Sequence, residues 1–102
     1  MTNTLSQSVQ HAIQILFAGD EQAEAACLLE EQCNEWLPNI SLHDVERVRL
    51  AVLKLSGGNL TRLKAAVNET KADWRDTLIS AGFGFNIHAH LQWIPVSPQR
   101  QL

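Results

Sequence analysis

Apolar residues recur every three or four positions along almost the whole chain, and in no stretch do they alternate with polar residues as in a half-buried strand. This spacing matches the ~3.6-residue period of an amphipathic α-helix. Short interruptions that contain Gly, Pro, Asn or Ser divide the pattern, and connections this short favour antiparallel neighbours. The sequence therefore predicts an all-α fold, a compact bundle of about four to six antiparallel helices.

The length and the composition fit one domain. The chain has 102 residues, of which 45% are hydrophobic and 19% are charged, as in a soluble globular protein. No repeat, low-complexity tract or Pro/Gly/Ser-rich linker divides it, so we expect a single helical domain over 1–102 with a flexible tail at 96–102. No stretch approaches the ~20 apolar residues of a membrane span, and no basic residue precedes Arg47 as in a secretory signal. A cytoplasmic protein is expected.

Residues that cap or break helices give the expected boundaries. The third helical stretch has the clearest start, because Ser41 and Asp44 have the spacing of a capping box. This stretch is apolar on more than one side, so we expect it at the centre of the bundle. The pattern predicts helices over about residues 5–18, 21–36, 41–56, 60–81 and 86–94.

The stretch over residues 60–81 is either one long helix or two helices that break near Ala72. A break would place Asp73 and Asp76 in a first turn, where carboxylates interact favourably with the helix dipole. We therefore favour the break, and the continuous helix is the alternative.

The segment DWRDTLISAGFGFNIHAHLQWIP, over residues 73–95, combines aromatic residues with a scarcity of charge. It holds four of the six aromatic residues of the chain, and no Asp, Glu, Lys or Arg occurs between Asp76 and Arg100. Gly82 and Phe83 indicate a helix C-terminus, with Gly82 left-handed and Phe83 folded back on the last turn. A final short helix should follow. Asn86 should cap this helix, and Ile87, Leu91 and Ile94 should lie on one of its faces.

The aromatic segment is the best candidate for a partner-binding surface. Aromatic side chains that the core cannot accommodate would form an exposed apolar patch, and tryptophan beside arginine is typical of binding hot spots. Whether each aromatic residue belongs to the core or to an interface stays open at this point. We expect a non-enzymatic interaction or regulatory protein, of the immunity or adaptor type, that binds a protein partner or itself as a homodimer. The candidate residues are Trp74, Arg75, Phe83, Phe85 and Trp93.

The alternative is a small metal- or metabolite-binding protein or a hydrolase that uses His88, His90, Asp73 and Asp76. Residues two apart on a helix point about 200° away from each other, so the two histidines cannot readily hold one ion, and no third ligand stands at an HExxH-like spacing. The two aspartates share a helix face without an identifiable nucleophile. We therefore expect one packed and one solvated histidine, and no metal, cofactor or catalytic residue.

Charge is divided unevenly along the sequence. Residues 1–46 contain eight acids and no Lys or Arg, whereas residues 47–102 contain eight bases and three acids. The acidic second helix could pack beside the basic third and fourth helices and pair with them at the rim of the bundle, or each side could face a partner of opposite charge. The bases fall on several helix faces, so the clustered basic surface that nucleic acid needs is not expected.

Three segments, ERVRLAVLKLSGG, ADWRDTLISAGFG and HAHLQWIP, are similar to segments of small uncharacterised bacterial helical proteins that share a DWRDxLxxAGFG-like motif. The similarity covers the chain from about Val45 onwards. The resemblance implies a bacterial, cytosolic, helical protein whose C-terminal segment is part of the fold. It implies no activity, cofactor or site residue.

Overall fold

The computed structural model describes residues 5–36, 42–84 and 89–95, and every regular element in these ranges is helical. Its long dimension is 38 Å and its short dimension 23 Å. The prediction of a compact all-α bundle is confirmed. None of the helices in the described residues combines the length and the apolar character needed to cross a membrane. The elements are α1 (Gln7–Leu16), α2 (Gly19–Trp36), α3 (Leu42–Ser56), α4 (Leu60–Ala72), α5 (Trp74–Ser80) and the 3₁₀ helix η1 (Ala89–Gln92).

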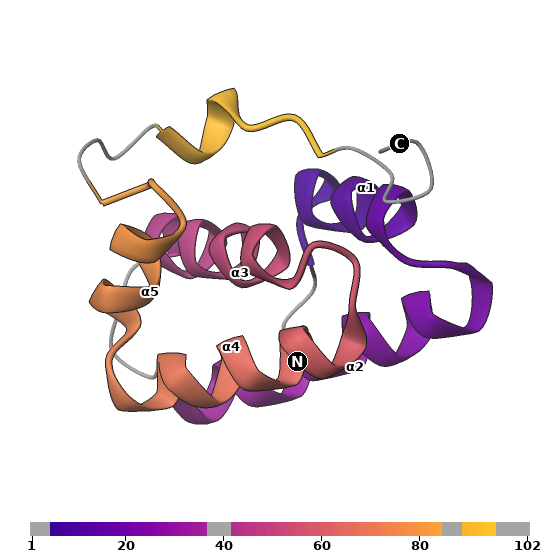
Figure 1. The fold of residues 1–102 in the computed structure, drawn as a ribbon, viewed down its shortest axis with the longest axis horizontal. Coiled ribbons are helices and arrows are strands. Elements are labelled where there is room, and N and C mark those ends of the chain that lie inside the picture. The colour runs from indigo at the N-terminus through magenta and orange to yellow at the C-terminus, as the bar shows by residue number, and fades with distance from the viewer. Residues whose placement is uncertain (1–4, 37–41, 85–88, 96–102) are drawn as a thin grey trace.

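Helix α3 lies at the centre of the fold, as its apolar pattern predicts. It packs against α1, α4, α5 and η1, while α2 packs against α1 and α4. In Figure 1, α2 and α4 run side by side along the bottom, and η1 crosses above α3. The buried side chains of α3 come from more than one side of the helix, among them Val48, Ala51, Val52 and Leu53.

The break in the fourth helical stretch is confirmed, and Asp73 produces it. Its extended backbone (φ −158°, ψ 99°) separates α4 from α5. The Asp73 N–H donates to the Glu69 carbonyl and closes α4, while its side chain accepts from the Arg75 N–H at 3.1 Å and opens α5. Asn59 caps α4 in the same way by accepting from the Arg62 N–H.

Helix α5 ends in a Schellman motif, so the predicted C-terminus is confirmed. Gly82 has φ +82°, and its N–H donates to the Ile79 carbonyl at 3.0 Å. The Phe83 N–H donates to the Leu78 carbonyl at 2.8 Å. Both hydrogen bonds satisfy carbonyls that the helix end would otherwise leave without partners. The Phe83 side chain returns to the core beside the last turn and is only 2% exposed.

Helix α2 differs from the expected pattern. It begins at Gly19, so Gly19 lies inside this helix and not in a linker after α1. Its inward stripe runs through Ala25 and Leu29, which are completely buried, whereas Ala23 is exposed. Small alanine residues on several sides of this helix make the stripe weakly defined by sequence. Ser41, Cys33 and the expected 37–41 turn lie outside the residues whose side chains are described.

The final helical element ends earlier than predicted, and the two described residues of its expected apolar face are exposed. The structure has one 3₁₀ turn, η1, which buries Ala89 and His90. Leu91 and Ile94, expected on a core-facing stripe, are 62% and 78% exposed. A four-residue 3₁₀ helix has about three residues per turn, so the α-helical spacing used for the prediction does not apply there. The predicted cap Asn86 and its neighbour Ile87 lie outside the described residues.

Two buried threonine hydroxyls join α4 to α5. Thr70 Oγ1 donates to the Ala66 carbonyl at 2.7 Å and lies 2.8 Å from Thr77 Oγ1. Because the Thr70 hydroxyl has one proton, already given to the carbonyl, Thr77 must donate to Thr70. Both residues are buried, so neither hydroxyl can exchange its partner for bulk water.

We predict that Thr70→Val lowers the free energy of unfolding by about 1–3 kcal/mol, because it leaves the Thr77 hydroxyl buried without its acceptor. Adding Thr77→Val should recover part of this loss, since no unsatisfied hydroxyl then remains. Urea unfolding of both single variants and the double variant measures the coupling. Strictly additive losses would contradict the assigned hydrogen bond.

Candidate functional site

Two of the three exposed large apolar side chains of the described residues lie in η1 or directly after it. Ile94 is 78% exposed and Leu91 62%, with Ile79 of α5 at 67%. Trp93 lies between the first two and is partly buried against the core. We call Leu91, Trp93 and Ile94 the C-terminal patch. No Asp, Glu, Lys or Arg occurs between residues 77 and 99, so the patch belongs to an uncharged stretch.

A groove of about 350 Å³ adjoins this patch. Three parts of the chain form it: α3, the turn that ends α5, and the segment around η1. The Phe83 and Trp93 rings supply its aromatic surface, with their centroids 6.4 Å apart at a tilt of 53°. We call it the η1 groove. Its lining residues are Lys54, Gly82, Phe83, Ala89, Gln92, Trp93 and Ile94.

Lys54 places a positive charge at this groove. Its Nζ atom lies 5.1 Å from the centroid of the Phe83 ring, within the range of a cation–π interaction. A Cβ atom built on Gly82 would lie 3.7 Å from the same Nζ atom, so the ammonium also approaches the turn. The sequence does not indicate Lys54 as a site residue, because a tertiary contact between α3 and the end of α5 brings it beside Phe83.

The predicted partner-binding residues separate into different environments. Phe83 is almost completely buried, so most of its ring belongs to the core, and the residue also lines the η1 groove. Trp93 is half-buried and lines the groove. Trp74 is half-buried against the core and lies outside the groove lining, and Arg75 stacks over its ring at 5.3 Å. Phe85 lies outside the described residues.

The alternative site is not assembled in the described part of the chain. Asp73 serves as the junction between α4 and α5, and Arg75 forms no ion pair there with Asp73 or Asp76. His90 is buried edge-on to Phe83, with ring centroids 6.4 Å apart. It lines a hollow of about 150 Å³ together with His11 of α1. Among the described residues, no three His, Cys, Asp or Glu side chains gather as metal ligands. His88 lies outside them.

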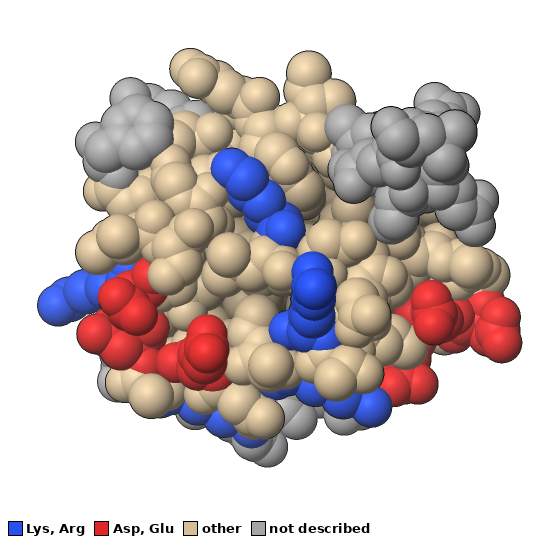
Figure 2. Space-filling model, viewed as in Figure 1, with Lys and Arg blue, Asp and Glu red and all other residues tan. Residues whose placement is uncertain are grey.

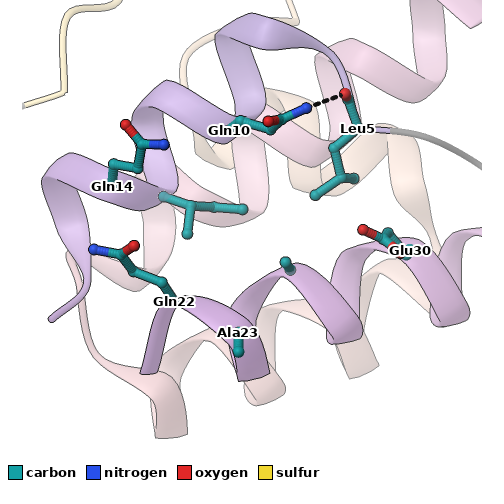
Figure 3. Close-up of a pocket in the computed structure, with 8 residues that line it drawn as sticks. Leu5, Gln10, Gln14, Gln22, Ala23 and Glu30 are labelled. Atoms are coloured by element: carbon teal, nitrogen blue, oxygen red, sulfur yellow. Dashed lines mark hydrogen bonds between the residues drawn. The ribbon is translucent and has the colours of Figure 1, made fainter. Parts of the chain in front are cut away.

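A second groove, of about 360 Å³, lies between α1 and α2. Figure 3 shows Gln10 and Gln14 on α1 opposite Gln22 on α2, with Leu5 pointing into the space between the helices. Gln10 Nε2 donates to the Leu5 carbonyl at 2.8 Å, and Gln22 Nε2 donates to the Phe17 carbonyl at 3.0 Å. These two amides thus bind the backbone where α1 begins and ends, a structural role.

No family model matches the chain, and no curated protein or solved structure matches it either. Its function must therefore be argued from its own side chains.

The charged residues are arranged differently in space than along the sequence. Lys64 of α4 and Glu24 of α2 form an ion pair at 3.1 Å on the surface of the bundle, so an acidic and a basic helix do pair with each other. Arg47 and Arg49 are buried, at 7% and 4% exposure, and cannot contribute to a basic surface. In Figure 2 the acidic residues lie in the lower half of the view, and the described surface of the upper half is tan apart from a basic side chain near its centre.

Arg47 supports the groove from the inside. Its Nη1 donates to Asp44 Oδ1 at 2.9 Å, and its Nη2 donates to the Phe83 carbonyl at 3.0 Å. Arg49, two positions along α3, points to the other side of the helix. In the described part of the chain, no acceptor reaches its buried Nε and Nη2 atoms. The two arginines therefore make opposite contributions to stability: one charge is paired and the other is desolvated without hydrogen bonds at these atoms.

We predict that Arg47→Met lowers the free energy of unfolding by about 2–4 kcal/mol, because it removes both hydrogen bonds and leaves the Phe83 carbonyl unsatisfied. Arg49→Met is the matched control, since it changes an equally buried arginine on the same helix. The free energy of unfolding of Arg49→Met should exceed that of the wild type by about 1 kcal/mol or more. Chemical denaturation of both variants gives the comparison, and equal losses would contradict the assigned pairing.

Proposed function

We propose that this protein is a non-enzymatic interaction or regulatory protein that binds a partner protein through the C-terminal patch and the adjoining η1 groove. The observation that carries the proposal is the exposure of Leu91 and Ile94, at 62% and 78%, beside residues that are firmly packed. Ala89 and His90 are buried next to them, and Trp93 packs partly on the core. The segment is thus anchored by these side chains while Leu91 and Ile94 stay exposed, Leu91 beside the hollow next to α1 and Ile94 at the η1 groove.

Leu91 and Ile94 contribute little hydrophobic stabilisation to the fold while they are exposed to water. Burial of a large aliphatic side chain contributes about 1.5–3 kcal/mol relative to its exposure. Two such side chains within four residues, beside an aromatic-lined groove, form the kind of apolar surface that marks an interface. A partner that covers Leu91 and Ile94 would recover this contribution. An adaptor or immunity type of role, in which a small protein binds a larger one, fits such a surface.

Support for a catalytic or metal-binding function is weaker. Of the four residues in the alternative, Asp73 is used as a helix cap and His90 is buried beside Phe83. Neither of these roles makes the residue a nucleophile, an activated base or a member of a ligand cluster.

The proposal is tested by replacing Leu91 or Ile94 with Glu and measuring the affinity for a partner recovered from the native host. A charge placed on a desolvated interface should lower the affinity at least about tenfold. Ile79→Glu is the matched control, because Ile79 is 67% exposed on α5 and does not line the groove. All three variants should unfold within about 0.5 kcal/mol of the wild type, since the changed side chains are exposed. Light scattering of the wild type shows whether the partner is a second copy.

Retained binding in the Leu91→Glu and Ile94→Glu variants would refute the proposed surface. A loss of affinity shared equally by Ile79→Glu would indicate that general surface hydrophobicity, and not this patch, carries the interaction.

A further inference from the structure

We infer that the η1 groove recognises a partner segment in which a carboxylate lies next to an aliphatic or aromatic side chain, and that Lys54 binds the carboxylate. This inference rests on the proposed function and names the chemistry of the partner. The two components of the segment correspond to the two components of the groove: an ammonium group at its wall, and the apolar surfaces of Phe83, Trp93 and Ile94.

The charge component follows from what surrounds Lys54. Among the described residues that line the groove, Lys54 alone carries a charge. In the described part of the chain no carboxylate forms an ion pair with it. The ring of Phe83 covers one side of the ammonium, yet the residue is exposed, so N–H donors remain available to a ligand. A positive charge beside aromatic and aliphatic side chains is less completely surrounded by water, so it attracts an anion more strongly than a fully solvated charge.

The apolar component follows from the size and composition of the groove. Its volume of about 350 Å³ lies at the lower end of the ~300–1,000 Å³ range of ligand pockets, so it suits a few side chains of a peptide segment. Trp93 and Ile94 provide most of the apolar contact area, since Phe83 and Ala89 are buried behind them, while Gln92 offers an amide donor and acceptor to a peptide backbone. Ile94 belongs to both the groove and the C-terminal patch, so one partner could cover both.

Hydrogen bonds and ring contacts hold the Phe83 side of the η1 groove in place in the absence of a partner. The Phe83 N–H is bound to the Leu78 carbonyl, and the Phe83 carbonyl accepts from Arg47 Nη2 at 3.0 Å. The backbone of Phe83 is thus held on both sides, and its ring contacts Trp93, His90 and Lys54. A preformed surface loses little conformational entropy on binding, which favours even a small groove as a recognition site.

A protein carboxylate, from Asp, Glu or a chain terminus, is the anion that a surface with an adjoining aliphatic patch selects. A protein other than this chain is the proposed occupant. Binding of a second copy through the eight acids of residues 1–46 is the contrary outcome, and light scattering distinguishes it.

The experiment selects random linear peptides displayed on phage against the wild type and against Lys54→Met, Lys54→Glu and Lys54→Arg. Lys71→Glu is the matched control, because Lys71 is an exposed lysine outside the groove. We expect the wild type to enrich peptides with Asp or Glu beside Leu, Ile, Phe or Trp. Synthetic versions of these peptides should bind Lys54→Met about tenfold more weakly or worse. Lys54→Glu should prefer peptides with Lys or Arg, and Lys54→Arg and Lys71→Glu should behave like the wild type.

The outcomes separate this inference from the proposed function. Selected peptides that bind the Lys54 variants as tightly as the wild type, but lose binding to Ile94→Glu, overturn the inference and leave the interaction surface intact. Peptides that bind Leu91→Glu and Ile94→Glu as well as the wild type overturn both. The absence of any selected peptide also overturns the inference, and the Leu91 and Ile94 variants then test the surface with the host partner. A dimer in light scattering that Lys54→Glu dissociates identifies a second copy as the occupant, against a separate partner. Thermal unfolding confirms that each variant is folded.

Discussion

The buried guanidinium of Arg47 connects parts of the structure that are far apart in the sequence. It bonds the Asp44 carboxylate at the start of α3 and the Phe83 carbonyl after α5, which is 36 residues away. The Phe83 carbonyl lies beyond the last helical turn, where the helix itself supplies no donor. Arg47 therefore supplies the donor that lets the chain turn back over α3 and place the Phe83 ring in the core. The η1 groove, with Phe83 in its wall, depends on this placement.

The features that the sequence predicts well are those decided by local chemistry. Asp73 breaks the helix and Gly82 ends it because their backbone and side-chain preferences act within a few residues. The features that it misses are decided by tertiary contacts. The outward direction of Leu91 and Ile94 follows from the short 3₁₀ turn of η1 and from its packing on α3. The three-residue spacing of Leu91 and Ile94 is the same whether these side chains face the core or the solvent, so periodicity alone does not predict which.

The charge asymmetry is a second feature whose arrangement in space depends on tertiary contacts and is not predicted by the sequence. A sequence with acids in one half and bases in the other suggests two charged surfaces, but the helices of the two halves pack side by side. Glu24 and Lys64 pair across α2 and α4, and two arginines of α3 are buried. What the fold leaves at the η1 groove is a single lysine in a nearly uncharged surrounding. Such an isolated charge gives specificity to an apolar surface, because partners without a matching charge leave the ammonium partly desolvated.

Core and interface are not alternatives for the aromatic segment, because neighbouring residues take different roles. Phe83 is buried and Ile94 is exposed, while Trp93 lies partly in both environments and shares the groove with them. The free energy gained by burying Ala89, His90 and part of Trp93 holds η1 in place. The exposed residues are then presented on a backbone whose position the core determines, and a partner need not order that backbone itself. A small domain can in this way use one short segment to close its core and to form its binding surface.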